Sequence, residues 1–99
     1  MTITKIKKRN KKIVNFDRAR IERAITEACI EVNEIDKSFI GPLTDEIIHD
    51  LEHYFEGDCN EIFPTVEDVQ DVVERHLVSA NKYEVVKAYI LYRAGRGDE

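Results

Sequence analysis

The chain has 99 residues, of which 42% are hydrophobic and 35% are charged, a balance that suits one folded, helix-rich domain and excludes a disordered chain. No apolar run approaches the roughly 20 residues that span a bilayer, and the N-terminus lacks the hydrophobic region of a signal peptide. Two cysteines, Cys29 and Cys59, are too few for a disulfide framework and indicate the reducing cytoplasm.

Charge is distributed unevenly along the chain. The net charge is −5 at pH 7, but residues 1–23 contain nine Lys or Arg and two acids, whereas residues 24–99 contain six basic and eighteen acidic residues. A basic N-terminal segment on an acidic body predicts an anionic ligand near the N-terminus. It disfavours a long nucleic acid, because the acidic body would repel the phosphate backbone. A solvated charged arm is the alternative explanation of the same pattern.

A β-hairpin is predicted over residues 3–16. Strand-forming residues lie on either side of a possible turn at Asn10-Lys11, namely Ile3, Ile6, Ile13, Val14 and Phe16. Asp17 then suits the N-cap of a first helix. Apolar residues recur after it at helical spacing: Ile21, Ala24, Ile25, Ala28, Cys29 and Val32. We interpret Cys29, which lies on this stripe, as a small buried residue and not as a reactive thiol.

Three further helices are predicted. Pro42 opens the second helix, and Gly57-Asp58 ends it. Its apolar stripe is Leu43, Ile47, Leu51, Tyr54 and Phe55. Thr65 caps the third helix, with Asp68 as the partner of a weak capping box. The stripe of the third helix is Val66, Val69, Val73 and Leu77. After a break near Asn81, the fourth helix carries Val85, Val86, Ala88, Tyr89, Ile90 and Tyr92 and ends near Gly95.

The predicted fold is therefore α+β. Residues 61–63 are expected to add a short third strand to the hairpin, and this three-stranded sheet covers the four-helix bundle. We expect one domain over residues 1–95, with residues 96–99 starting a linker to an absent parent subunit.

Most catalytic and phosphate-binding motifs are missing from the sequence. No glycine precedes a Gly-Lys-Ser/Thr run, so side chains and a helix N-terminus must hold any phosphate. His49 and His53 lack the Glu of a zinc-protease helix and are expected to face solvent, which disfavours a metal site. His76 lies beside the apolar stripe of the third helix and is expected to be packed or partly exposed. No nucleophile and base occur at motif spacing, so the chain is not expected to be an enzyme on its own.

The segment from Lys7 to Ile21 carries the features that a nucleotide needs. A hairpin loop of cations is followed at once by a helix N-terminus, whose dipole and free N–H groups favour a phosphate. Arg9 and Arg20 supply permanent charges with bidentate geometry. Phe16 and Ile21 supply apolar surface for a base.

Three motifs in this chain resemble those of one known family, in the family's order. The opening motif is Lys8-Arg9-Asn10, then Phe16-Asp17 and Arg20-Ile21; the second is the run from Pro64 to Glu74; the third is the run from Lys87 to Arg93. Together they resemble the ATP-cone domain of ribonucleotide reductases, the N-terminal domain that sets overall activity. The resemblance implies a short three-stranded sheet over four helices.

The same resemblance implies a function and a site. ATP and dATP would be allosteric effectors, with Mg²⁺ on their phosphates; ATP permits activity and dATP stops it by changing subunit association. The implied partners are other reductase subunits and, with dATP, a second copy of the chain, whereas neither a membrane nor a nucleic acid is expected. Lys8 and Arg20 match phosphate-binding positions, and Thr65 or Val66 matches a further contact. The candidate nucleotide-binding residues are Lys8, Arg9, Asn10, Val14, Asn15, Phe16, Asp17, Arg20, Ile21, Thr65, Arg93 and Arg96.

Two positions depart from the family pattern. Lys11 stands where the family has a turn glycine, which implies strain or a longer loop. Ala94 stands where the family can carry a phosphate-contacting Lys, and Arg96 is a candidate replacement. Arg23, one turn beyond Arg20, is expected to matter less for binding.

Two other functions are compatible with parts of the sequence. A transcriptional repressor of reductase genes can carry the same domain, but the Cys-x-x-Cys zinc ribbon expected before it is missing. A free-standing nucleic-acid module could use the basic hairpin, but this chain lacks an aromatic-basic run and has an acidic body.

Overall fold

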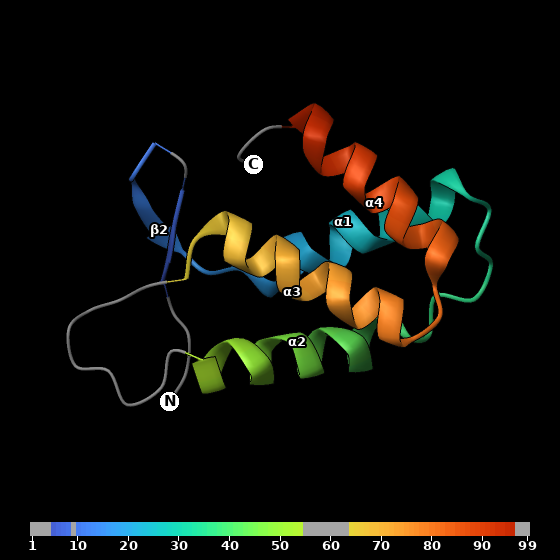
Figure 1. Cartoon of the computed structure of the whole chain (residues 1–99), viewed down its shortest axis with the longest axis horizontal. Coiled ribbons are helices and arrows are strands. Elements are labelled where there is room, and N and C mark those ends of the chain that lie inside the picture. The colour runs from blue at the N-terminus through green and yellow to red at the C-terminus, as the bar shows by residue number, and fades with distance from the viewer. Residues whose placement is uncertain (1–4, 9, 55–63, 97–99) are drawn as a thin grey trace.

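The computed structural model describes residues 5–8, 10–54 and 64–96, with the side chains of Tyr54 and residues 94–96 excepted. The described part is α+β (Figure 1), as the sequence predicts. Strands β1 (Lys5–Lys7) and β2 (Ile13–Asn15) pair antiparallel, with Ile6 opposite Val14. The hairpin predicted over residues 3–16 is confirmed for the residues that the structure describes; the second strand ends at Asn15, one residue before the predicted end.

The turn of the hairpin contains a strained residue. Lys11, where strain or a longer loop was expected, has a φ of 70°, in the left-handed region that costs a non-glycine residue about 1–2 kcal/mol. Its N–H donates to the Lys8 carbonyl at 2.9 Å, and Asn10 Oδ1 accepts from the Lys12 N–H at 3.0 Å. These bonds close the loop and hold Lys11 in its unfavourable conformation.

Helix α1 (Arg18–Glu31) begins where the sequence predicts. Asp17 is extended, with φ −133°, and its side chain accepts the Ala19 N–H at 3.0 Å, which satisfies one of the free donors of the first turn. The predicted stripe faces the core. Its buried members are Ile21, Ile25, Ala28 and Cys29. Burial also raises the pKa of the Cys29 thiol, so the structure agrees with an unreactive packing residue.

Helix α2 (Ile40–Tyr54) begins earlier than predicted. Pro42 does not open it, because the helix starts two residues before it, at Ile40. Proline is tolerated there since an N–H in the first turn has no intrahelical acceptor. The predicted stripe residues Leu43, Ile47 and Leu51 are buried. The expected contributions of Phe55 and Gly57-Asp58 lie outside the described residues, as does the Tyr54 side chain.

The third and fourth predicted helices are confirmed as α3 (Val66–Ser79) and α4 (Tyr83–Arg96). Thr65 and Asp68 form a reciprocal capping box, with side chain to backbone distances of 3.0 and 2.9 Å. Asn81 provides the break between the helices, with a φ of 62°. The last helical residue, Arg96, lies one position after the predicted end.

The four helices pack around one core, and the hairpin lies at one end of them, beside the start of α3 (Figure 1). Contacts join α1 to α2 and α4, and α3 to α2 and α4. The predicted third strand, residues 61–63, lies outside the described residues, so the structure confirms two strands and not three. Just after it, the Lys7 N–H donates to the Pro64 carbonyl at 2.9 Å, and Lys7 bridges Thr65 in parallel. These contacts tie the hairpin to the cap of α3.

Within the described ranges, every helix is too short or too polar to pass through a lipid bilayer.

Candidate functional site

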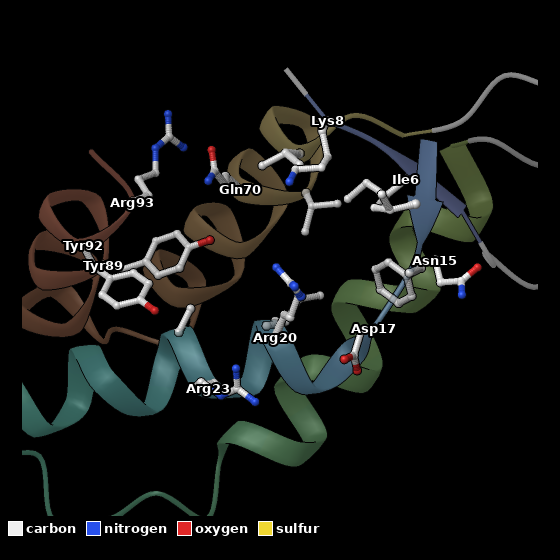
Figure 2. Close-up of a pocket in the computed structure, with 16 residues that line it drawn as sticks. Ile6, Lys8, Asn15, Asp17, Arg20, Arg23, Gln70, Tyr89, Tyr92 and Arg93 are labelled. Atoms are coloured by element: carbon white, nitrogen blue, oxygen red, sulfur yellow. The ribbon is translucent and has the colours of Figure 1, made fainter. Parts of the chain in front are cut away.

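A cavity of about 220 Å³ opens where the hairpin meets the helices (Figure 2). Residues from β1, β2, the first half of α1, the start of α3 and the end of α4 line it. In the view of Figure 2, Asn15 and Asp17 lie at one end, Arg93 and Tyr92 at the other, and Lys8 and Arg20 between them. The cavity is therefore elongated from the start of α1 towards the end of α4.

The end formed by β2 and the start of α1 is mainly apolar. Val14, Phe16 and Ile21 line it, and Phe16 and Ile21 also pack against the hydrophobic core. Asp17 lines the same end while its carboxylate caps α1, and Asn15 Oδ1 accepts from Lys5 Nζ at 2.7 Å. Such a surface, apolar with polar groups at its edge, fits a flat heterocycle joined to a polar group.

Three cations line the middle of the cavity. Lys8, Arg20 and Arg23 make no ion pair with any residue that the structure describes. Arg18, on the same turn of α1, differs, because it donates to Asp45 at 2.7 Å and to Glu22 at 3.2 Å. Uncompensated positive charges beside a helix N-terminus attract a polyanion strongly.

The end formed by α3 and α4 combines a compensated arginine with aromatic residues. Arg93 Nη1 donates to Glu74 Oε2 at 2.5 Å and lies 3.7 Å from Asp71 Oδ1. Burial, and then the charge of Glu74, raise the pKa of the Tyr89 phenol well above its ordinary value. Tyr89 therefore stays neutral over the whole physiological range and keeps its O–H available as a donor.

Gln70 contributes a buried polar group without a partner. Its side chain lines the cavity, the residue is 9% exposed, and within the described structure Oε1 accepts no hydrogen bond. A buried unpaired acceptor costs about 1–3 kcal/mol, so such groups are uncommon unless a ligand or water satisfies them. Gln70 is therefore a polar group in the cavity wall that a ligand or an ordered water can satisfy.

Most of the predicted site residues lie together around this cavity. The lining includes Lys8, Val14, Asn15, Phe16, Asp17, Arg20, Ile21 and Arg93. Thr65 is not among the lining residues, because its side chain caps α3; the neighbouring Val66 lines the cavity instead. Asn10 lies in the hairpin turn and is likewise not among the lining residues. The side chains of Arg9 and Arg96 lie outside the described residues.

The sequence analysis missed several residues that line the cavity. They are Ile6, Ala24, Val69, Gln70, Tyr89 and Tyr92. Arg23, which was expected to matter less, and Val66, the alternative to Thr65, line it too. Arg23 is three positions after Arg20, so both lie on one face of α1, and that spacing could have identified it. Gln70 is a polar residue on the buried face of α3, and a polar residue at an otherwise apolar helix position could also have been recognised in the sequence.

The histidines take no part in this cavity. His49 and His53 are exposed on α2, as predicted. His76 is partly buried, as expected, and its Nε2 lies 2.6 Å from Asp50 Oδ2, so it links α3 to α2. These residues have a structural explanation independent of a ligand.

Comparison with known proteins identifies one family over almost the whole chain. The pattern of the family described as the ATP cone domain matches residues 4–98. Two vitamin B12-dependent ribonucleoside-diphosphate reductases, from the CDC 1551 / Oshkosh and H37Rv strains of Mycobacterium tuberculosis, are each 36% identical over 94 residues. The match covers 95% of this chain and 12% of each reductase, so the chain spans about an eighth of the length of these relatives.

Proposed function

Because the chain belongs to the ATP-cone family, we propose that it is a regulatory module that binds ATP and dATP and has no catalytic activity of its own. The observation that carries this proposal is the set of three cations, Lys8, Arg20 and Arg23, which lie beside the N-terminus of α1 and form no ion pair with a described residue. The apolar end of the same cavity offers room for a base. One cavity thus combines the two kinds of surface that a nucleotide requires.

The distribution of charge suggests how the nucleotide lies. The base rests against Phe16 and Ile21, with the ribose near Asn15 and Asp17. The phosphates extend towards Lys8 and Arg20, where no carboxylate among the described residues competes for them. A phosphate chain that continues from Lys8 and Arg20 away from Asp17 leads to Arg93, as the positions of these residues in Figure 2 indicate.

Mg²⁺ would enter together with the phosphates. Asp17 is the one carboxylate that the described lining supplies, and it already accepts a backbone N–H as the cap of α1. Mg²⁺ requires six oxygen ligands and usually keeps several waters. We therefore propose that phosphate oxygens and water coordinate the ion and that the protein provides no dedicated carboxylate cage.

We further propose that the domain controls a ribonucleotide reductase. Its relatives named above are vitamin B12-dependent ribonucleoside-diphosphate reductases. In this proposal ATP permits the activity of the parent enzyme and dATP stops it.

Calorimetric titration tests the binding proposal directly. We expect both ATP and dATP to bind with micromolar affinity, about −8 kcal/mol, and neither to be hydrolysed. The expected heat arises from phosphate contacts to Lys8 and Arg20. Steady release of inorganic phosphate above a no-protein control would contradict the absence of catalysis, and the lack of any binding heat or protection against unfolding would contradict the effector site.

The regulatory proposal predicts different assembly states with the two effectors. ATP and dATP differ by one ribose hydroxyl, and a hydrogen bond to that group is worth about 0.5–1.5 kcal/mol, which shifts a subunit equilibrium about 2- to 13-fold. Tyr89 and Tyr92 of α4 line the cavity, so α4 can transmit the difference between bound ATP and bound dATP to the surface of the domain. We expect dATP, and not ATP, to raise the apparent mass in light scattering. Equal masses in both nucleotides, for the domain and its parent enzyme, would contradict this mechanism.

A further inference from the structure

Arg93 differs from the other cations of the cavity because carboxylates already engage it. Glu74 accepts from its Nη1 at 2.5 Å, and Asp71 Oδ1 lies 3.7 Å away. Lys8 and Arg20, in contrast, lack a carboxylate partner within ranges 5–8, 10–54 and 64–96. Arg93 lies at the end of the cavity opposite Asp17 (Figure 2), and its pair with Glu74 connects α4 to α3.

The Arg93–Glu74 ion pair is partly shielded from solvent. The side chains of Arg93 and Glu74 are 26% and 23% exposed, whereas Asp71 is 65% exposed. A carboxylate attracts a guanidinium more strongly in partly desolvated surroundings than on an open surface. Glu74 is therefore an effective competitor against any other anion that approaches Arg93.

We propose that the Arg93–Glu74 pair senses the terminal phosphate of the effector: a nucleoside triphosphate breaks the pair, and a diphosphate leaves it in place. The inference rests on the proposed function, in which the phosphates extend from Arg20 towards Arg93. The first two phosphates meet cations that no described carboxylate opposes. The third phosphate can bind Arg93 only if it displaces Glu74, and it must then also approach a second carboxylate, Asp71.

Glu74 thus has two effects on the response. It lowers the affinity for triphosphates, because part of the attraction to Arg93 is lost in breaking the pair. It also links the contact between α3 and α4 to the presence of the third phosphate, since the pair joins those helices. Glu74 is in this sense a specificity-determining residue that need not contact the effector.

The test compares ATP and ADP, each with Mg²⁺, binding to the wild type, Glu74→Gln, Arg93→Ala and the double variant. We expect Glu74→Gln to tighten ATP about 3- to 10-fold and ADP less than about twofold. In the Arg93→Ala background the same substitution should change neither affinity. Glu84→Gln is the control, because it also removes one negative charge, from an exposed pair with Lys87 on α4, and Glu84 does not line the cavity.

Several outcomes would overturn the sensor. Equal tightening of ATP and ADP, or tightening that persists without Arg93, would show that Glu74 acts through charge alone. If Glu74→Gln fails to unfold cooperatively, Asp71→Asn provides the same comparison and should give a smaller effect of the same sign. A wild-type domain that binds neither nucleotide would overturn the proposed function, whereas wild-type binding without the Glu74 effect overturns the sensor alone.

Discussion

Replacement of Arg20 with Ala is expected to weaken ATP binding by about 1.5–3 kcal/mol, which is about 10- to 150-fold. Arg20 lines the middle of the cavity, and no described carboxylate neutralises its charge. Its guanidinium is therefore free to form charge-assisted hydrogen bonds with phosphate, and these bonds are lost in the variant. Lys8→Ala should give a loss in the same range. Calorimetry at fixed ionic strength measures both.

Arg18→Ala is the matched control for this prediction. It removes the same charge from the same turn of α1, but Arg18 is paired with Asp45 and Glu22 and does not line the cavity. We expect its effect on ATP affinity to stay within about twofold. Arg23→Ala is unsuitable as a control because Arg23 lines the cavity, and its loss should be intermediate. A loss for Arg18→Ala equal to that for Arg20→Ala would show that general surface charge, and not this cavity, holds the nucleotide.

Local signals in the sequence account for the elements that were predicted correctly. Asp17 and Thr65 cap their helices through bonds between residues two or three positions apart, so short-range pattern is sufficient to find them. Pro42 misled the prediction of α2 because proline is compatible with several positions of a first helical turn. The start at Ile40 depends on packing, since Ile40 and Leu43 are both buried in the core.

The candidate site also has one part that local sequence signals predict and one part that depends on packing. Its first half, from Lys8 to Ile21, is one continuous segment, so its charges and its helix start could be recognised together. Its second half comes from α3 and α4, and only the packing of these helices brings Gln70 and Tyr89 to the cavity. Tyr89 has the residue type and spacing of an ordinary core position, and it is indeed 4% exposed. Nothing in a single sequence distinguishes such a position from one that also borders a ligand.

Gln70→Met is expected to change stability and binding in opposite directions. Met has nearly the length and volume of Gln but needs no hydrogen bond, so it removes the unpaired acceptor Oε1 without opening a large cavity. The ligand-free domain should gain about 1–2 kcal/mol in the free energy of unfolding.

The binding of ATP to Gln70→Met should weaken by about 1–2 kcal/mol, because Met can neither donate nor accept a hydrogen bond. In the proposed pose Gln70 lies beside the phosphates, between Lys8 and Arg93 (Figure 2), so its amide can donate an N–H to a phosphate oxygen and Oε1 can accept from a water that hydrates the phosphates. Inorganic triphosphate should therefore lose affinity by about the same factor as ATP. Denaturant unfolding measures stability, and titration with ATP and with inorganic triphosphate measures binding. Since the variant is expected to be the more stable protein, weaker ATP binding could not be attributed to partial unfolding. A variant that loses stability would show that Gln70 supports the shape of the cavity. A variant that loses affinity for ATP but not for inorganic triphosphate would show that Gln70 contacts the nucleoside and not the phosphates.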